Sequence, residues 1–510
     1  MMSTFALAFC QPMFRRIALS WLLAALTCSL MPRAARAQVI FTGAKPNVNV
    51  GSLKIGSTSA TVSLPFNIGA NTTVGRIAVL TTGSKGRDFA QATGSTCTAR
   101  TFTAGTRCTV NVEFKPSVAG LRLGAVVFFS GADNKSTVWA EVPVFGIGTG
   151  PQLVFGPGGA QSTVGRQFVS PEAVAMDAVG NAYVGDIALQ EVFKVTPSGK
   201  QTTIGSGLEV PGGVAVDGAG NVYITDSQAA VVYKVTPGGA QTQVGSGFSF
   251  PSGVAVDGAG DVYVSDPFIP AVFKITPAGK QTMVGGGYNT PAGVAVDPAG
   301  NVYVADTYNA AVFKITPGGK QTIVGANLNA PAAVAVDAAG SLYITDDGTD
   351  SLYEVTADGT QTTVSDRLNV PNGVALDGLG NLYLANTFDE EILKIERADS
   401  PSLLFDTTRI DHTSADSPRT VRVENIGNAV LNFSALSYPP DFPEGALDDD
   451  CTASTSLSAA DACSLTIEFS PVTPLGSKPS VVLSEAVKLT TNSLNVQKVE
   501  QVNVSGKELP

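Results

Sequence analysis

The sequence predicts an all-β protein with a six-bladed β-propeller at its centre and a β-sandwich on each side. Three observations predict this fold class. A unit with a step of 40 residues occurs six times without an insertion between residues 171 and 396. Each unit holds four short strand-like runs separated by turn sequences, which is typical of a propeller blade. The segments before and after the repeats match each other and alternate short strands with turns, as antiparallel sandwiches do.

The repeat is most visible in three residue series. No segment shows an apolar period near 3.6, which excludes a solenoid built from helices. The series are Pro171, Pro211, Pro251, Pro291, Pro331 and Pro371; Asp177, Asp217, Asp257, Asp297, Asp337 and Asp377; and Tyr183, Tyr223, Tyr263, Tyr303, Tyr343 and Tyr383.

The unit that begins at Pro291 shows the elements in order. Its strand-like runs are GVAVD, NVYVAD, AVFKIT and KQTIVG. Gly300 can take the positive φ that the tight turn between the first two runs needs. Pro317-Gly318-Gly319 forms a second turn. We expect the Asp177 series, at the first turn, to accept hydrogen bonds from backbone N–H groups, and the Tyr183 series to lie in the core between blades.

The sixth unit ends at Glu396 without its fourth strand. A matching run, GAQSTVG, precedes the first unit at residues 159–165. We therefore expect residues 159–165 to complete the last blade and close the ring, which would remove two exposed sheet edges.

The period and the VAVDxxGNxYVxD pattern resemble NHL repeats, and are similar to the propellers of streptogramin lyases and of some bacterial receptor kinase sensors. The resemblance covers residues 150–397 and implies the fold, which hosts sensors, scaffolds and enzymes alike. Asn309, in the run DTYN, stands where the family's Asn would, and the family's His is absent. Streptogramin lyases depend on a propeller His, so the resemblance does not carry that activity to this chain.

The two flanks share an NIG motif, a DF motif and a run that starts at Cys and ends in F-x-P. This set is similar to the Hydin-type immunoglobulin-like modules, also called ASH or choice-of-anchor D. The resemblance implies immunoglobulin-like sandwiches at residues 38–149 and 398–510, which usually serve as spacers or protein-binding units. The matched residues are Asn67–Gly69 with Asn425–Gly427, Asp88-Phe89 with Asp441-Phe442, and Cys108–Pro116 with Cys463–Pro471.

Residues 1–37 have the features of a signal peptide. Arg15 and Arg16 precede an apolar run, and Ala35-Arg36-Ala37 fits an A-x-A cleavage site. The run of about 15 residues is shorter than the roughly 20 that span a bilayer. We expect an extracytoplasmic chain (periplasmic, cell-surface or secreted) without a transmembrane segment. A retained membrane anchor is the alternative, and the paired arginines leave twin-arginine export open.

Four cysteines remain after the predicted cleavage. They form two local pairs with no nearby His, which predicts two disulfides in an exported chain and argues against a zinc site. Free buried thiols are the alternative. The pairs are Cys97 with Cys108 and Cys451 with Cys463.

The six units differ most in the loop between their second and third strands. The linker before each repeat proline also varies, and it carries an apolar residue in every unit, as Phe168, Leu208, Phe248, Tyr288, Leu328 and Leu368. In an up-and-down blade both segments lie on the same face, which predicts a varied face rich in exposed aromatics and carboxylates. Unconstrained drift of the loops is the alternative. The candidate ligand-binding residues are Phe268, Ile269, Tyr308, Asn309, Asp347, Asp350, Phe388 and Asp389.

Catalysis has thin support in the sequence. The repeats contain no His or Cys, and the one His of the chain, His412, lies in the C-terminal flank, where we expect it at the surface. This excludes a Ser-His-Asp triad, a Cys-His pair and a His-bound zinc within the propeller. A second Asp series ends the second strand of each unit. A ring of these carboxylates could hold Ca²⁺, but we expect them to hydrogen-bond a neighbouring loop, and we expect no cofactor. The series is Asp186, Asp226, Asp266, Asp306 and Asp346, with Asn386 in the sixth unit.

The chain has a net charge of −11, and residues 151–397 hold 24 acidic and 11 basic residues. Nucleic-acid binders need basic surface, so we expect no nucleic-acid partner. We expect a monomeric, non-enzymatic binding or scaffold protein whose varied face recognises a protein, peptide or glycan. The alternatives are a metal-dependent lactonase- or lyase-type enzyme on the propeller and a purely structural envelope component.

Overall fold

The computed structural model describes residues 38–133, 135–156, 160–445, 450–472, 480–494 and 500–509. The predicted signal peptide lies outside these residues. The regular secondary structure of the described residues consists of β-strands and three single-turn 3-10 helices, so the all-β prediction is confirmed. Within this part of the chain, no helix is long and apolar enough to cross a membrane.

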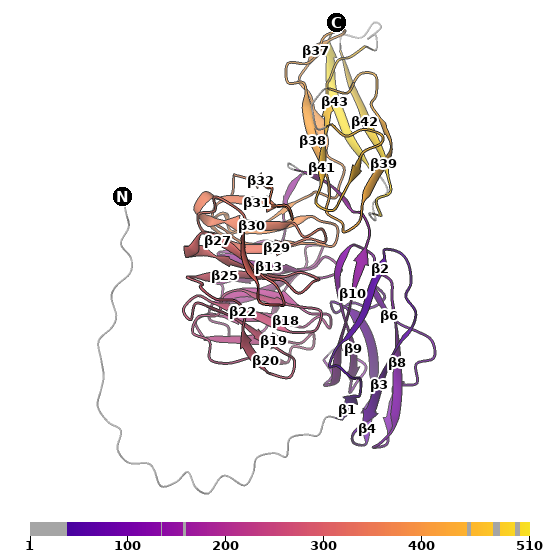
Figure 1. Ribbon diagram of the computed structural model, residues 1–510, viewed down its shortest axis with the longest axis vertical. Coiled ribbons are helices and arrows are strands. Elements are labelled where there is room, and N and C mark those ends of the chain that lie inside the picture. Colours follow the sequence, from indigo (N-terminus) through magenta and orange to yellow (C-terminus); the bar gives the residue numbers. More distant parts are fainter. Residues whose placement is uncertain are drawn as a thin grey trace, which may run out of the picture.

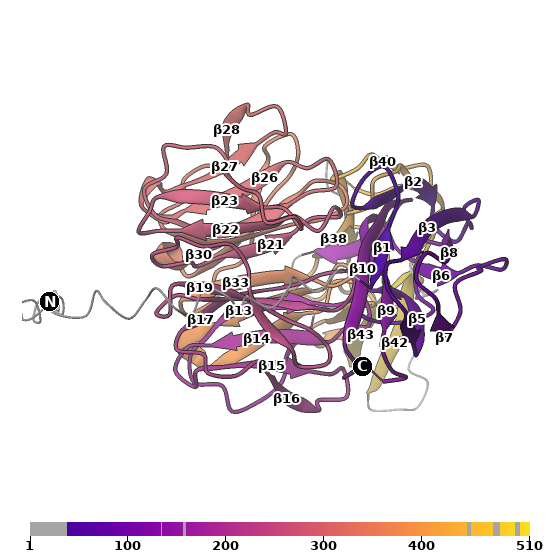
Figure 2. The same ribbon diagram turned by 90° about the horizontal axis from the view of Figure 1, so that it is seen from below.

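The six repeat units form six four-stranded antiparallel sheets, which we call the ring (Figures 1 and 2). The arrangement is consistent with a β-propeller. In strand order the sheets are β13 (Pro171–Met176), β14 (Ala182–Asp186), β15 (Glu191–Val195), β16 (Gln201–Ile204); β17 (Pro211–Val216), β18 (Val222–Asp226), β19 (Val231–Val235), β20 (Gln241–Gln243); β21 (Val254–Val256), β22 (Val262–Asp266), β23 (Ala271–Ile275), β24 (Gln281–Met283); β25 (Pro291–Val296), β26 (Val302–Asp306), β27 (Ala311–Ile315), β28 (Gln321–Val324); β29 (Pro331–Val336), β30 (Leu342–Asp346), β31 (Ser351–Val355), β32 (Gln361–Ser365); and β33 (Pro371–Leu376), β34 (Leu382–Asn386), β35 (Glu391–Ile395), β12 (Gln161–Thr163).

Strand β12 supplies the missing fourth strand of the last sheet. It pairs with β35, with Gln161 opposite Ile395. The N–H of Val164 extends this pairing by donating to the carbonyl of Ile392 at 2.8 Å. The inner strands β33 and β13 also contact each other, so the ring is closed. Residues 160–165 therefore complete the sixth sheet as expected, while residue 159 lies outside the described residues.

Each sheet is covered on both faces by its neighbours, and this explains the apolar second strands. Tyr183 and Val192 of the first sheet pack against Leu208 and Val214 at the start of the second. Every residue of the second strands is buried. The Tyr183 series lies in the core between the sheets, as predicted, with all six rings buried.

The first turn of each unit is held by its aspartate. Asp177 Oδ1 accepts the N–H groups of Val179 and Asn181, and Oδ2 accepts the Asn181 amide and the Tyr183 hydroxyl at 2.6 and 3.2 Å. The Lys194 ammonium lies over the Tyr183 ring and donates to its hydroxyl. The expected capping role is therefore confirmed. We call the end of the ring that carries these turns the turn face, and the opposite end, which carries the loops after the second strands, the loop face.

Residues 39–149 form two four-stranded sheets around one core, which we call the N-terminal sheet pair. A separate two-stranded sheet adjoins them. The sheets are β1 (Val39–Phe41), β3 (Val62–Ile68), β8 (Arg107–Phe114), β6 (Phe89–Gln91); β2 (Val48–Lys54), β10 (Val138–Thr149), β9 (Gly120–Phe129), β5 (Arg76–Thr81); and β4 (Thr72–Val74), β7 (Arg100–Phe102).

Strands from residues 153–156 and 402–509 form a second pair of sheets around one core, which we call the C-terminal sheet pair. Disulfides join Cys97 to Cys108 and Cys451 to Cys463, as predicted. The sheets are β11 (Leu153–Gly156), β38 (Arg419–Asn425), β41 (Ala462–Ile467); and β36 (Ser402–Leu404), β43 (Gln501–Leu509), β42 (Val481–Thr491), β39 (Leu431–Ser437), β40 (Ser456–Leu457), with β37 (Thr408–Arg409) beside β43.

The matched DF motifs occupy equivalent positions in the two flanks. Phe89 stacks on Phe114 with ring centroids 4.8 Å apart, and Phe442 stacks on Phe469 at 4.9 Å. The preceding aspartate caps the strand end in both cases, because the Asp88 and Asp441 carboxylates accept the N–H groups of Ser117 and Val472. The sequence match thus reflects one local geometry used twice.

The predicted start of the propeller at residue 150 is wrong. Strand β11 pairs with β38, with Leu153 opposite Asn425, and it belongs to the C-terminal sheet pair. Leu153 and Phe155 enter the C-terminal core, while the N–H of Phe155 donates to the Arg397 carbonyl at 2.8 Å. All four residues of β11 are buried, because the strand lies between a core and the ring. The chain therefore passes through the C-terminal sheet pair before it enters the ring.

Candidate functional site

The turn face of the ring is covered by the N-terminal sheet pair (Figure 1). The Thr82 hydroxyl accepts the N–H of Ala178 at 2.7 Å, and the N–H of Gly83 donates to the Gly218 carbonyl. Glu141 of β10 reaches Lys234 of the second sheet at 2.9 Å. These contacts lie on the first and second units.

The position after the turn aspartate is glycine where the N-terminal sheet pair comes closest. A Cβ on Gly218 would meet the backbone of Gly124, and one on Gly258 would meet the Phe145 ring at 2.5 Å. In the first and fourth units the residue after the turn aspartate is Ala178 and Pro298, so the turn itself accepts a side chain at this position. These glycines therefore allow the N-terminal sheet pair to pack closely against the ring.

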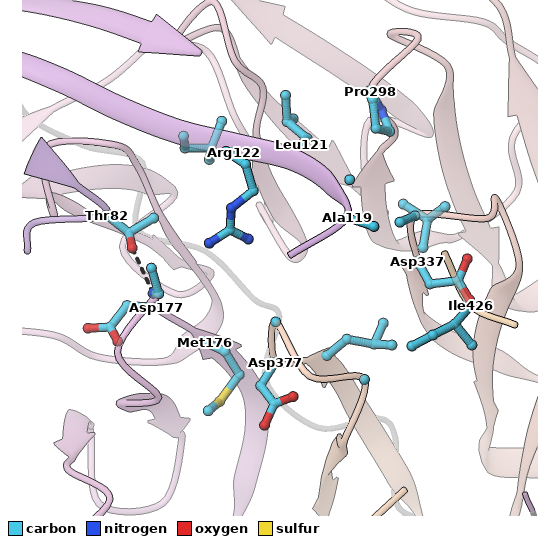
Figure 3. A pocket seen from close by; sticks show the side chains of 18 of the residues that line it. Thr82, Ala119, Leu121, Arg122, Met176, Asp177, Pro298, Asp337, Asp377 and Ile426 are labelled. Carbon is cyan, nitrogen blue, oxygen red and sulfur yellow. Dashed lines mark hydrogen bonds between the residues drawn. The ribbon is translucent and has the colours of Figure 1, made fainter. Parts of the chain in front are cut away.

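A cavity of about 240 Å³ remains between the sheet pair and the ring. Arg122 points into it, and the turn aspartates Asp177, Asp337 and Asp377 are in its wall (Figure 3). Arg122 is held by Asp88, whose Oδ2 accepts its Nε–H at 2.5 Å. The aspartates are held by their own turns. The cavity therefore lies behind the N-terminal sheet pair, on the end of the ring that the pair covers.

The Asp186 series holds the backbone of the loop face. Asp186 accepts the N–H groups of Val169 and Ser170 in the preceding linker, and those of Ala188 and Leu189 in the following loop, at 2.8 to 3.2 Å. The carboxylates of this series are buried, and each accepts hydrogen bonds from backbone N–H groups of its own linker or loop. Within the described ranges, no group of three or more His, Cys, Asp or Glu is placed to hold a metal ion. Each of these carboxylates therefore holds its own loop and linker, which is the hydrogen-bonding role that the sequence predicted.

Three of the predicted site residues are aromatic and project from the loop face. Phe268, Tyr308 and Phe388 are 70%, 76% and 69% exposed. They stand at the same position in the loops after β22, β26 and β34, and the last two lie in the 3-10 helices η1 (Thr307–Asn309) and η3 (Thr387–Asp389). Several exposed aromatic side chains on one face mark a recognition surface more often than a surface without a binding role.

The six apolar linker residues predicted for this surface do not join it, and here the prediction is wrong. The residues Phe168, Leu208, Phe248, Tyr288, Leu328 and Leu368 are all buried. Phe168 packs edge-on against Phe193 of the same sheet at 5.7 Å, and Phe248 packs against Phe273 in the same way. The linkers therefore close the core below the loop face.

The other predicted site residues differ in their partners. Asn309 donates to the Gly287 carbonyl and to Asp306, which ties its loop to the linker. Asp350, which follows the 3-10 helix η2 (Asp347–Thr349), accepts the N–H of Val370. Asp389 accepts the side-chain amides of Asn369 and Asn386. Ile269 and Asp347 are half-buried.

The mouth of the central channel lies on the loop face and contains a residue that the sequence reasoning missed. A cavity of about 150 Å³ is lined there by the residues that directly follow the repeat prolines, which are Glu172, Gly212, Ser252, Ala292, Ala332 and Asn372. Glu172 is the one ionisable member. Burial, with Asp347 and Asp186 nearby, raises the pKa of Glu172 to about 7. Comparing the six units at this strand position, and not only in the loops, would have found it.

Glu172 predicts a pH dependence of stability. Because its pKa is raised in the folded state, the folded chain holds this proton more tightly than the unfolded chain, and stability falls as pH rises from about 4.5 to about 7. The change Glu172→Gln should therefore raise the free energy of unfolding at pH 8 by about 1 kcal/mol, after allowance for solvent screening, and leave it unchanged at pH 4. Denaturant unfolding at both pH values checks this. The exposed Glu209→Gln serves as control, and an equal gain at both pH values would contradict the assignment.

Comparison with known proteins supports the repeat assignment. A family model described as NHL repeat matches residues 288–315, in the fourth unit, so the NHL resemblance is confirmed there. No curated protein sequence matches the chain.

Several solved structures are similar in part. A gluconolactonase from Xanthomonas campestris is 14% identical with a TM-score of 0.42, and the match covers 49% of this chain and 98% of that one. Virginiamycin B lyase from Staphylococcus aureus is 14% identical with a TM-score of 0.39, over 55% and 92% of the two chains. An auxiliary nutrient binding protein from Bacteroides thetaiotaomicron VPI-5482 is 13% identical with a TM-score of 0.41, over 70% and 99%. Likeness at this level does not assign an activity.

Proposed function

We propose that this chain is a non-enzymatic, extracytoplasmic binding or scaffold protein that recognises a protein, peptide or glycan through the loop face. In this proposal the repeats form a six-bladed NHL-type propeller, and the flanks at residues 38–149 and 398–510 are immunoglobulin-like modules that hold it. The predicted signal peptide and the two disulfides support a location outside the cytoplasm.

One observation carries the proposal. The N-terminal sheet pair occupies the turn face, whereas three aromatic side chains project from the opposite, loop face. Aromatic side chains supply large contact area at low entropic cost and are enriched among residues that dominate binding energy. The loop positions also carry most of the sequence differences among the units, as expected where a rigid scaffold presents a binding surface.

The proposal leaves catalysis out because the residues of the ring offer neither a Ser-His-Asp triad nor a Cys-His pair. The ring contains no His or Cys, and the Asp186 series is buried and used by the backbone. The groups that remain on the loop face suit recognition: exposed rings, amides and carboxylates.

The triple change Phe268→Ala, Tyr308→Ala and Phe388→Ala tests the proposal. The full chain should retain a ligand from envelope extracts or a glycan array, and the triple variant should bind it at least about tenfold more weakly without loss of stability. The matched control removes exposed apolar side chains elsewhere, with Met283→Ala, Ile323→Ala and Val482→Ala. Equal binding by the parent and both variants would overturn the role of the loop face.

A further inference from the structure

The carboxylates of the loops that follow the second strands are gathered in three neighbouring units, and Glu209, in the linker before Pro211, is an exposed carboxylate outside them. The positions compared are the loop after the second strand, the first residue of the third strand and the residue after the repeat proline. The second, third and fourth units have no ionisable side chain at these positions. The inner strands β29, β33 and β13 are in contact, so the fifth, sixth and first units form one continuous arc. We call its carboxylates the acidic arc: Glu172, Glu191, Asp347, Asp350, Asp389, Glu390 and Glu391.

The acidic arc is not paired with Lys or Arg in the part of the chain that the structure describes. None of the ion pairs among the described residues includes any of its seven members. Their recorded partners are neutral, such as the Asn369 and Asn386 amides on Asp389 and the N–H of Val370 on Asp350. Two basic residues, Arg166 and Arg367, are exposed in the linkers of this face without an ion pair to the arc. The exposed members of the arc therefore keep their negative charge toward solvent, whereas Glu172, with a pKa of about 7, is about half-protonated at neutral pH.

The third and fourth units carry an apolar group on this face. Phe268 stacks on Phe250 with ring centroids 4.7 Å apart, and its N–H is held by Asp266. Ile269 lies beside it and Tyr308 follows in the next unit. We call Phe250, Phe268, Ile269 and Tyr308 the aromatic arc. The stacked rings of Phe250 and Phe268 are already held, so they lose little conformational entropy on binding.

We infer that the ligand of the loop face is a basic peptide segment whose Lys or Arg side chains lie on the acidic arc while its apolar side chains pack on the aromatic arc. This inference rests on the proposed function and narrows it to one class of partner. Opposite charge steers such a segment and selects against acidic competitors. Phe388, within the acidic arc, offers a ring face to a cation. A neutral glycan would pack on the aromatics and could donate its hydroxyls to the carboxylates, but it would gain no attraction between opposite charges.

The test measures binding of the full chain to three labelled probes by fluorescence anisotropy. The probes are a short peptide that alternates Lys with Phe, the same peptide with Glu for Lys, and a chitin oligosaccharide. We expect the Lys/Phe peptide to bind at low salt and to weaken steeply as salt rises, because exposed charges are screened. The Glu/Phe peptide should bind at least about tenfold more weakly.

The decisive variant neutralises three exposed members of the acidic arc, with Glu191→Gln, Asp350→Asn and Glu390→Gln. Asn at 350 can keep the positive φ of that residue and the hydrogen bond to Val370. This variant should bind the Lys/Phe peptide about tenfold more weakly at low salt, and the difference should shrink at high salt. The matched control neutralises three exposed carboxylates in other parts of the chain, with Asp133→Asn, Asp399→Asn and Glu444→Gln, and should bind like the parent.

The outcomes separate this inference from the proposed function. Failure of the Lys/Phe peptide to bind, or equal binding by the arc variant and the parent, overturns the inference. If the oligosaccharide or the Glu/Phe peptide binds instead, and the triple aromatic variant loses it, the loop face remains a recognition surface with a different partner.

Discussion

Replacing Arg397 with Met is expected to lower the free energy of unfolding by about 3–5 kcal/mol, the typical cost of removing one member of a buried ion pair. The Arg397 side chain is 2% exposed and lies between the ring and the C-terminal sheet pair. It is paired with Glu424, donates to the Tyr343 hydroxyl at 2.7 Å, and lies 3.9 Å from Glu354. Without Arg397, the buried carboxylates of Glu354 and Glu424 would depend on the partly exposed Arg422 as their cationic partner.

The repeats explain why this arginine is needed. Five units carry a Lys over the tyrosine ring, as Lys194 lies over Tyr183, but the fifth has Glu354 at that position. Arg397 lies over Tyr343 in its place. The second change Glu354→Lys should therefore recover part of the loss in the Arg397→Met background, because it restores the pattern of the other units.

Urea unfolding of the full chain measures both changes. The control is Arg419→Met, whose side chain is 41% exposed and pairs with Asp416 three residues away. Surface pairs contribute less than about 1 kcal/mol, so this variant should stay near the parent. If Arg397→Met costs no more than Arg419→Met, the cluster does not couple the ring to the C-terminal sheet pair.

The second large effect is expected at Gly218. The change Gly218→Val places a side chain against the Gly124 backbone, which cannot move as a side chain can. Overpacking of this kind costs about 1–3 kcal/mol, and we expect the upper part of that range together with displacement of the N-terminal sheet pair. Denaturant unfolding gives the energy, and small-angle X-ray scattering gives the increase in radius of gyration.

Gly286→Ala is the matched control for this change. A Cβ at Gly286 meets nothing within 4 Å, so the variant should unfold and scatter like the parent. An unchanged radius of gyration for Gly218→Val would mean that the sheet pair does not depend on this close approach.

The repeat allowed much of the ring to be predicted, because a fixed period makes each deviation visible. The absence of a fourth strand after Glu396 predicted that the segment before the first unit would close the ring, and β12 does so. The aspartate, glycine and tyrosine positions of the turns followed from local chemistry. The acidic arc was visible in the same alignment of units, but its continuity required the order of the sheets in space.

The linker residues were misjudged for a physical reason. A single apolar residue in a varied loop gives no sign of whether it points outward or inward. The missing signal was pairing within the unit: units with an aromatic linker residue, such as Phe168 or Phe248, have Phe in the third strand, as Phe193 and Phe273. Units with Leu208 or Leu328 have Tyr233 or Tyr353 there. Strand β11 gave no comparable signal, because its partner lies about 270 residues later in the chain.

Strand β11 has a consequence for incomplete chains. A product that ends near residue 397 would contain Leu153 and Phe155 without the sheet that buries them. An unpaired apolar strand is a template for intermolecular pairing, so such truncated chains should aggregate even though every repeat is present. During synthesis the strand emerges long before its partner, and the chain must keep it from pairing elsewhere until the last sheets arrive.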